Sequence, residues 1–371
     1  MRRTGQKRGF LKKSLLFMLA LLLLCANTAC AKKDGDLPPS PERKKPSWFA
    51  PLLAPEPEPE PILNPLTHMP VTDETALERR VVVVSIDNDT PARPQAGIST
   101  ADIMYEVPAE GGISRLLALF FTDAPETIGP VRSARPYIVN VAREWQGLFV
   151  HCGGSPDALN YLAKGEVNWL NEMANGKYFW RDKSRKAPHN LFTSSENLYI
   201  FLADKGWEQV NTPRALPFYG PEEGPPATAL KADTVNINYA NKINRNTYTY
   251  DPQSKLYARS IGNEPHIDKN TEAQVQAANI LVQRVKSKVL DSVGRLEINL
   301  VGEGEALLFT QGTVQQGAWK RASLDEPTYF CDADGAEWHL SPGQTWIQIC
   351  DGVTKVLYED STAEEQLTIN N

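Results

Sequence analysis

Charged and hydroxyl side chains gather in the glycine- and proline-rich stretches between residues 87 and 189, and their types suit the binding of an anion. The candidate binding residues are Asp87, Glu106, Glu110, Arg115, Arg132, Ser133, Arg135, His151, Ser155, Arg185 and His189. Loops that carry fixed charges are where binding sites usually lie. The planar guanidinium group of arginine matches the oxygens of a carboxylate or phosphate in pairs. If the fold brings the four arginines together, they form such a clamp. Alternatively, the arginines form ion pairs with the three acidic residues of the group and have only a structural role. The residue types alone favour this alternative.

Two of these residues, Glu106 and Glu110, allow a second interpretation, because they flank a Val-Pro-Ala segment just before the Gly111-Gly112 turn. A pair of carboxylates can act as acid and base in the cleavage of a glycan, and their separation sets the stereochemical outcome. His151 or His189 would then assist proton transfer. The sequence does not fix the separation of the two carboxylates, so a wall hydrolase is the alternative to simple binding.

The segment from Phe149 to Asp157 reads as a strand, a tight glycine turn and the start of a helix, with Ser155 as the N-cap and Pro156 in the first turn. Such a junction directs free backbone N–H groups toward a docking carboxylate or phosphate. A capped helix without a ligand has the same pattern. Neighbouring residues on a strand point to opposite faces, so His151 and Cys152 are not expected to form a catalytic pair.

Signatures of metal and cofactor chemistry are missing from the sequence. The five histidines are scattered, and no HExxH, HxH or CxxC spacing occurs. There is also no P-loop, no dinucleotide-binding glycine fingerprint and no GxSxG elbow. We therefore predict no metal and no cofactor.

Aromatic and cysteine residues of the second half leave two further alternatives open. Trp319, Trp338 and Trp346 form either a stacking platform for sugar rings or part of the core, and core packing is the expectation for two of the three. Cys331 and Cys350 lie in strand-like segments and allow one disulfide, but buried free thiols are the favoured interpretation.

The elements that must position these residues follow from the hydrophobic pattern. In the first half, apolar runs over 81–86, 114–122 and 148–152 predict buried strands. Helices are predicted over 133–145 and 195–206, the latter with a serine N-cap and a glycine after its end. In the second half, alternating segments predict strands over 235–239, 296–300, 306–309, 338–340 and 346–349. One helical insertion is expected near 271–279.

This pattern predicts an α+β protein, in which a mixed α/β domain over 71–216 is followed by a smaller, mainly antiparallel β domain over 227–360. The proline- and glycine-rich segment 217–226 would join the two domains, and residues 361–371 would form a tail. Length agrees with this division, because roughly 300 residues usually split into two domains.

The first 31 residues have the pattern of an export signal, with six cations, an apolar run from Leu15 to Ala26 and small residues around Cys30. The run of twelve residues is shorter than the ~20 that cross a bilayer as a helix. If Cys30 becomes the first residue, it takes a lipid whose acyl chains tether the protein to the bilayer. Cleavage after Ala31 would instead release a soluble protein. We favour lipidation of Cys30.

Residues 32–70 contain eleven prolines and an alternating Pro-Glu repeat, which predicts an extended spacer without a packed core. The first 29 residues carry six cations and no acid, so their removal takes the formal net charge from −6 to −12. Binding to nucleic acid needs a broad basic surface. We therefore expect no nucleic-acid partner.

Several short motifs resemble those of the YerB-like lipoprotein family. In the first half they include Val83-Val-Ser-Ile-Asp-Asn88, Ala109-Glu-Gly-Gly-Ile-Ser-Arg115, Ile128-Gly-Pro-Val-Arg-Ser-Ala-Arg-Pro136 and Arg181-Asp-Lys-Ser-Arg-Lys-Ala-Pro-His-Asn190. In the second half they include Arg259, His266, Asp268 and Gly343-Gln-Thr-Trp346. The resemblance implies a secreted, lipid-anchored protein of Gram-positive bacteria with two uncharacterised domains, and it brings no established reaction.

The resulting hypothesis is a non-catalytic, extracytoplasmic lipoprotein that is held at the lipid bilayer through acylated Cys30. It would bind a cell-envelope component such as peptidoglycan, or an envelope protein, through its Arg/Glu-rich cleft. A cell-wall glycan hydrolase that uses Glu106 and Glu110 is one alternative, and a solute-binding protein for a small anion is another. The sequence indicates neither the ligand nor the oligomeric state.

Overall fold

The computed structural model describes residues 61–123, 125–208, 212–240, 245–360 and 366–368, which belong to one compact unit that runs from Pro59 to Asn371. The predicted export signal with Cys30, most of the predicted spacer and most of the predicted tail lie outside these residues. The packed fold begins before Val71, because Leu66 is buried and the side-chain amide of Asn64 donates to Asp102. Residues 61–70, at the end of the predicted spacer, are therefore part of the folded unit.

Strands predominate among the described residues, and the three α-helices all lie in the first half of the chain. The helices are α1 (Pro136–Glu144), α2 (Pro156–Leu162) and α3 (Ser195–Lys205). The strands of the first half are β1 (Val82–Asp87), β2 (Ile103–Pro108), β3 (Ser114–Phe120), β4 (Leu148–His151), β5 (Asn168–Asn171), β6 (Trp180–Arg181) and β7 (Leu191–Phe192).

The second half consists of strands joined by turns. They are β8 (Leu230–Lys231), β9 (Thr234–Asn238), β10 (Arg245–Asp251), β11 (Leu256–Ile261), β12 (Glu264–Pro265), β13 (Gln276–Ala277), β14 (Asn279–Arg284), β15 (Ser287–Val289), β16 (Leu296–Ile298), β17 (Gly302–Thr310), β18 (Thr313–Arg321), β19 (Tyr329–Cys331), β20 (Thr345–Cys350), β21 (Lys355–Glu359) and β22 (Gln366–Thr368).

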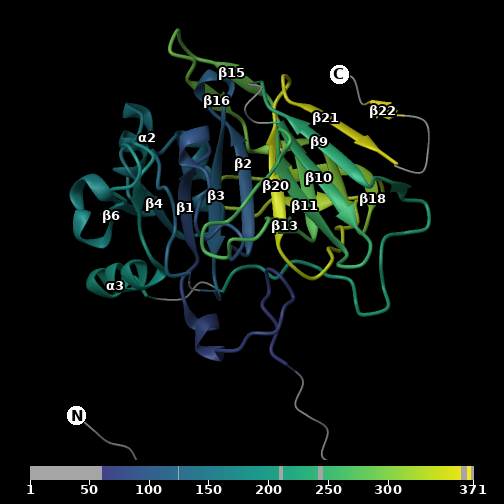
Figure 1. Cartoon of the computed structure of the whole chain (residues 1–371), viewed down its shortest axis with the longest axis horizontal. Coiled ribbons are helices and arrows are strands. Elements are labelled where there is room, and N and C mark those ends of the chain that lie inside the picture. Colours follow the sequence, from purple (N-terminus) through teal and green to yellow (C-terminus); the bar gives the residue numbers. More distant parts are fainter. Residues whose placement is uncertain (1–60, 124, 209–211, 241–244, 361–365, 369–371) are drawn as a thin grey trace, which may run out of the picture. The chain divides into compact units, whose positions relative to one another are not determined.

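One large sheet runs through both halves of the chain. Its strand order is β19-β18-β17-β14-β20-β2-β3-β1-β4-β5, with β8 paired to β18, and Figure 1 shows β4, β1, β3, β2 and β20 side by side. Strand β2 of the first half pairs in parallel with β20 of the second half, from Ile103 opposite Thr345 to Glu106 opposite Gln348. A second sheet, with the order β12-β11-β10-β9-β21-β22 and β13 paired to β11, is formed by the second half alone.

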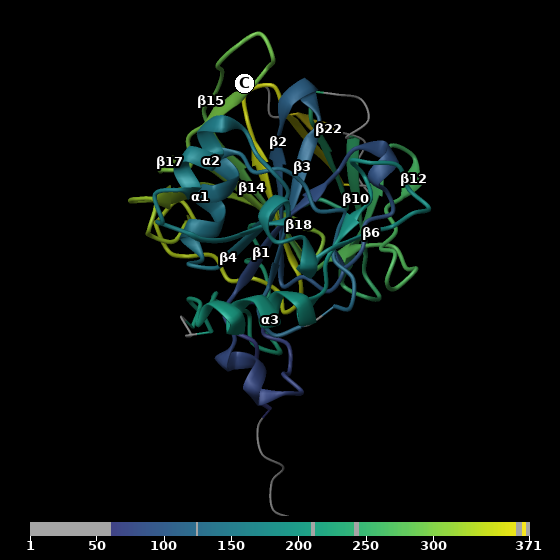
Figure 2. The same ribbon diagram turned by 90° about the vertical axis from the view of Figure 1, so that its left-hand side faces the viewer.

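Buried side chains form a core on each face of the large sheet. Val82 and Val84 of β1 belong to one core, together with residues of the second sheet such as Ile237 and Tyr248. Val83, one residue along the same strand, belongs to the other core, together with apolar residues of α1 and α2. This alternation is the period of two that a strand imposes on its side chains. Figure 2 shows α1 and α2 together, with α3 apart from them.

Most of the predicted elements are confirmed, with shifted ends. The three predicted strands of the first half correspond to β1, β3 and β4, and the predicted helix over 195–206 is α3, whose N-cap is Ser194 rather than Ser195. The predicted mixture of helices and strands is confirmed, but the two halves of the chain are less sharply separated into domains than predicted. The helices lie in the first half, whereas the large sheet joins both halves and includes the parallel pair β14–β20.

The predicted helical insertion near 271–279 is wrong. Glu272 has a positive φ of 54°, and the N–H of Val275 donates to the carbonyl of His266, so this segment turns and then pairs as extended chain. Asn279 already belongs to β14. Tertiary pairing with β11 therefore overrides the local helical propensity of this segment.

Candidate functional site

The candidate site lies at the edge of the large sheet where the parallel strands β1, β4 and β5 end, which we call the carboxyl edge. These strands end at Asp87, His151 and Asn171. The segment 132–135, which leads into α1, crosses this edge. The N–H of Arg132 donates to the carbonyl of Ser85, and that of Ala134 donates to the carbonyl of Gly153. In open α/β sheets, ligands bind outside the carboxyl ends of parallel strands.

Arg115 is a buried cation at the carboxyl edge that lacks a close carboxylate partner. It lies at the start of β3, opposite Asp87 of β1, and only 4% of its surface is exposed. Its Nη1 donates weakly to the carbonyl and hydroxyl oxygens of Ser133, both at 3.5 Å. Its Nε has no hydrogen-bond partner, and it forms no ion pair with any residue that the structure describes. Burial lowers the pKa of Arg115 to about 10, because a buried charge loses its hydration.

Two further arginines lie beside Arg115, and the three together are here called the arginine cluster. Nε of Arg132 is 3.1 Å from Oδ2 of Asp87, although the N–H is not aligned for a hydrogen bond. Arg135 pairs with Glu110 and donates from Nη1 to the hydroxyl of Ser133 at 3.1 Å. The cluster therefore sets three guanidinium groups against two carboxylates, and it contains an excess of positive charge.

His189 joins the same edge from a distant loop. Its Nδ1 is 2.7 Å from Oδ2 of Asp87, the carboxylate oxygen that also faces Arg132. Asp87 is 1% exposed, and its Oδ1 accepts from the backbone N–H of Asp89. Asp87 thus holds His189 and Arg132 in place at the end of β1.

Glu106 lies inside the fold and is bonded to a different set of residues. It is fully buried and forms an ion pair with Arg259 of the second half, at 2.8 Å and with both side chains unexposed. Asn88, Ser114 and Asn246 also donate to its carboxylate. Glu110 instead bonds to Arg135 at the carboxyl edge. The structure thus gives the two glutamates separate partners, and Glu106 has no surface that a glycan can reach.

The remaining predicted site residues serve the local structure. Nδ1 of His151 contacts the carbonyl of Gly153 at 2.7 Å, and burial lowers the pKa of His151 to about 4. Ser155 is the N-cap of α2, where it accepts from the N–H of Ala158. Arg185 donates to the carbonyls of Ala92 and Pro94 and so ties its loop to the segment that follows β1.

Cys152 also lies at this edge, one residue beyond the end of β4. Its thiol donates to Glu172 at 3.2 Å, and burial together with this glutamate raises the pKa of Cys152 to about 11. His151 stacks instead on Phe149. The two neighbours therefore contact different groups, as expected for adjacent residues of a strand, and the thiol stays protonated at neutral pH.

The tryptophans and cysteines of the second half belong to the interior. Trp319, Trp338 and Trp346 are all at most 5% exposed, so they form core rather than a sugar-stacking platform. Cys331 and Cys350 are free thiols, as favoured from the sequence. Within the described residues, no group of three or more His, Cys, Asp or Glu side chains is placed to hold a metal ion.

The buried partners of Glu106 could not be found by local reasoning. Arg259 lies 153 residues away in sequence and also contacts His266, whose Nε2 is 2.8 Å from the side chain of Gln95. The face of Trp346 covers the guanidinium of Arg259, with 4.5 Å between the charged carbon and the ring centroid. The sequence signal for Arg259 and His266 was the family resemblance alone.

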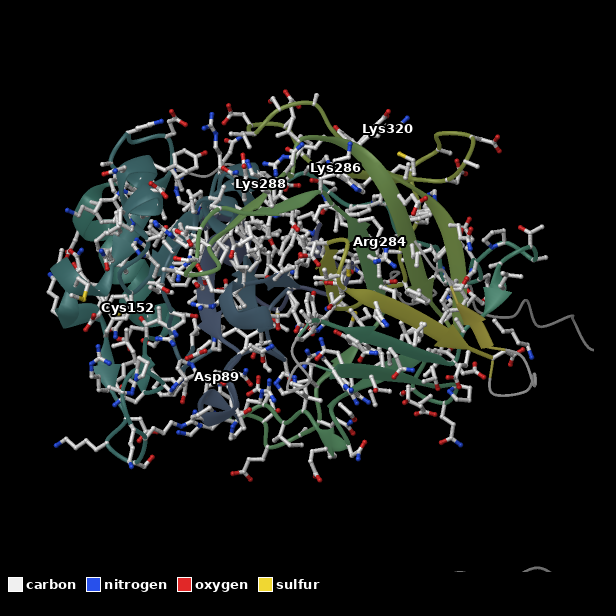
Figure 3. The ribbon with its side chains drawn as sticks, turned by 90° about the horizontal axis from the view of Figure 1, so that it is seen from above. Asp89, Cys152, Arg284, Lys286, Lys288 and Lys320 are labelled. Carbon is white, nitrogen blue, oxygen red and sulfur yellow. The ribbon has the colours of Figure 1, made fainter. Side chains whose placement is uncertain are left out.

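A second group of cations lies on the strands of the second half and on the turn between β14 and β15. Figure 3 labels its members, Arg284, Lys286, Lys288 and Lys320, away from Asp89 and Cys152. Lys286 and Lys288 line one surface pocket with Pro136, the residue that follows Arg135. Lys288 is paired across the strands with Glu297, and Lys320 with Glu303. Because acidic side chains lie opposite these lysines, this group has less excess positive charge than the arginine cluster.

The fold and the site define a strand-rich protein whose two halves share one sheet and whose carboxyl edge is cationic. The chain matches the N-terminal domain of a protein of unknown function (DUF3048) over residues 66–208, and the C-terminal domain of the same family over residues 235–347. It therefore belongs to the DUF3048 family.

Relatives from one bacterium support this assignment. The putative lipoprotein YerB of Bacillus subtilis (strain 168) is 35% identical over 288 residues, which are 77% of this chain and 85% of the relative. The crystal structure of the YerB protein from Bacillus subtilis matches with a TM-score of 0.72 at 33% identity, and the match covers 80% of this chain and 99% of that chain. The resemblance to YerB-like lipoproteins is thus confirmed. Within the described residues, no helix has the length and apolar character needed to cross a membrane.

Proposed function

We propose that this protein is a lipoprotein tethered outside the cytoplasm through Cys30, and that it binds an anionic group of a cell-envelope component at the arginine cluster without cleaving it. The bound group is a carboxylate or a phosphate, since paired guanidinium N–H groups match the oxygens of both. Arg115, Arg132 and Arg135 supply the positive charge, and Ser133 supplies a hydroxyl.

The observation that carries this proposal is the state of Arg115. A buried guanidinium without a partner of opposite charge costs free energy, so folded proteins nearly always pair such a group. Here the carboxylates of Asp87 and Glu110 already form ion pairs, Asp87 with Arg132 and His189, and Glu110 with Arg135. An anion that reaches the cluster would supply the charge that Arg115 lacks.

The tether is supported by the sequence and by the relative. Cys30 follows a short apolar run and small residues, and the Bacillus subtilis relative is named a putative lipoprotein. The spacer between Cys30 and the folded unit would hold the folded unit away from the bilayer. When fully extended, such a spacer adds roughly 3.1 Å of length per residue.

The experiment that tests this function incubates the chain lacking its first 31 residues with purified cell-wall sacculi. Bound protein is measured in the pellet, and released muropeptides are measured in the supernatant. We expect binding without release for the unaltered protein, and at least tenfold weaker binding for the double variant Arg132→Gln/Arg135→Gln. The matched control is Lys286→Gln/Lys288→Gln, which removes the same charge from the second group of cations and should bind normally.

Other outcomes would support the alternatives. Muropeptide release that disappears in Glu110→Gln would show a hydrolase and overturn the proposal. Equal binding by the two double variants would mean that the arginine cluster is not the site. If sacculi do not bind but phosphate or acetate raises the melting temperature, the protein is a solute binder for a small anion.

A further inference from the structure

A cavity lies at the opposite end of α1 from the arginine cluster. It has a volume of about 140 Å³ and lies where β2 of the first half meets β20 of the second half. Its apolar walls come from both halves, with Ile103 on β2, Leu281 on β14 and Ile347 on β20. Trp145, at the end of α1, and the segment 212–217 also line it.

The volume of the cavity sets the size of what it can hold. An apolar cavity of roughly 150 Å³ in a protein core stays dry and takes up benzene. The present cavity therefore fits a molecule of about one six-membered ring, not a sugar chain or a peptide.

The charges at the rim exclude an ionic ligand, because each has a partner of opposite sign. Arg214 pairs with Glu337 at 2.8 Å, and Glu144 pairs with Arg321 at 3.1 Å. Asp325 pairs with Arg143 at 2.6 Å. A charged ligand would have to break one of these pairs or enter without a counter-charge.

Two polar groups in the wall can still donate a hydrogen bond. The indole N–H of Trp338 is buried and has no hydrogen-bond partner among the described residues. The hydroxyl of Tyr105 accepts from the indole N–H of Trp145 at 2.9 Å, and it donates to none of the described residues. Tyr105 is 3% exposed, and burial together with nearby Glu144 raises its pKa well above the usual value, so it keeps its proton. A buried donor without an acceptor is costly, and a ligand oxygen would relieve that cost.

We propose that this cavity binds a small neutral molecule with a ring-sized apolar body and one oxygen that accepts a hydrogen bond from Tyr105. The site is separate from the proposed anion site, and it does not depend on the proposed function. Its two walls come from different halves of the chain, so occupancy would strengthen the junction between β2 and β20.

The test uses two probes of similar shape, cyclohexanone and methylenecyclohexane, in which a carbonyl oxygen is replaced by a CH₂ group. Binding to the chain lacking its first 31 residues is followed by the fluorescence of Trp145 and Trp338, which both line the cavity, and by the melting temperature. We expect both probes to bind, with cyclohexanone three- to tenfold tighter, because one net hydrogen bond is worth about that ratio.

Two variants separate a binding role of Tyr105 from a structural one. Tyr105→Phe should leave the affinity for methylenecyclohexane unchanged and remove the preference for cyclohexanone. Leu340→Phe, which fills part of the cavity, should weaken both probes. The inference is overturned if neither probe binds the unaltered protein at millimolar concentration, or if Tyr105→Phe keeps the preference for the ketone.

Discussion

At the scale of the residue, the central feature is a cation that the fold buries without neutralising it. Arg115 is 4% exposed and has no ion pair among the described residues, whereas Arg259, also buried, has Glu106. Arg259 is therefore a structural charge, neutralised inside the fold, whereas the charge of Arg115 is available to a bound anion. A residue whose native conformation or environment costs folding free energy is common at functional sites.

This contrast predicts an unusual response to substitution at position 115. Arg115→Met should raise the free energy of unfolding by about 1 to 3 kcal/mol, because it removes an unpaired buried charge and keeps a side chain of similar length. The same variant should lose binding to sacculi. Urea denaturation measures the first effect, and a large destabilisation would instead mean that Arg115 is a structural partner of Asp87.

His151 gives a second prediction at this scale, through the dependence of stability on pH. Its pKa is lowered to about 4 in the folded state, against a usual value of 6.5. The unfolded chain therefore binds a proton first as the pH falls, so His151 stabilises the fold above pH 6.5 and loses this contribution between pH 6.5 and pH 4.

Comparison with a variant isolates this effect from other titrating groups. Between pH 7 and pH 5, the unaltered protein should lose about 2 kcal/mol of unfolding free energy relative to His151→Gln. The difference matters because Asp102, whose pKa is raised to about 7 by burial, acts in the opposite direction over the same range. A difference that does not change with pH would show that His151 is ordinarily solvated.

At the scale of the element, the pairing of β2 with β20 decides how the protein holds together. Their paired residues, such as Glu106 and Gln348, are 242 positions apart in the sequence, yet the two strands lie in register within the large sheet. Removal of the second half would expose β2 as an edge strand and leave Glu106 buried without Arg259.

The first half is therefore not expected to fold alone. A fragment over residues 59–216 should lack a cooperative unfolding transition by circular dichroism, whereas the fragment 59–371 should have one. The reference fragment controls for the missing leader. Cooperative unfolding of the short fragment, with resistance to protease, would show that the halves are independent.

The same elements show what a sequence can and cannot predict. The strand in the apolar run Val81–Ile86 and the capped helix α3 were predictable, because hydrophobic periodicity and helix-capping residues are local signals in the sequence. The β2–β20 pairing was not, since a pairing over such a separation leaves no local trace. In the candidate site, Arg132 and Arg135 were predictable as neighbours in sequence. The burial of Glu106 by Arg259 and the contact of His189 with Asp87 depend on tertiary structure.

At the scale of the whole molecule, the proposed protein consists of a lipid anchor, a spacer and a folded unit with a cationic edge. Because the chain without its first 29 residues would carry a formal net charge of −12, a local excess of positive charge at the carboxyl edge stands out against the rest of the protein. The anchor would confine this edge to a layer next to the membrane.

The anchor predicts where the protein is found after cell fractionation. The unaltered protein should sediment with the membranes and require detergent for release, whereas Cys30→Ala should appear in the soluble fraction or the medium. Ser194→Ala, which keeps the leader intact, serves as a control for expression. Membrane association of Cys30→Ala that only detergent reverses would show a different means of attachment.

The most direct test of the central claim observes the arginines themselves. The side-chain Nε–H signals of the ¹⁵N-labelled protein would be recorded by NMR as soluble wall fragments are added, with Arg115 assigned through Arg115→Met. We expect the signals of Arg115, Arg132 and Arg135 to shift together while that of Arg284 stays in place. Unchanged signals from the cluster, in the presence of fragments that demonstrably bind the protein, would contradict this expectation.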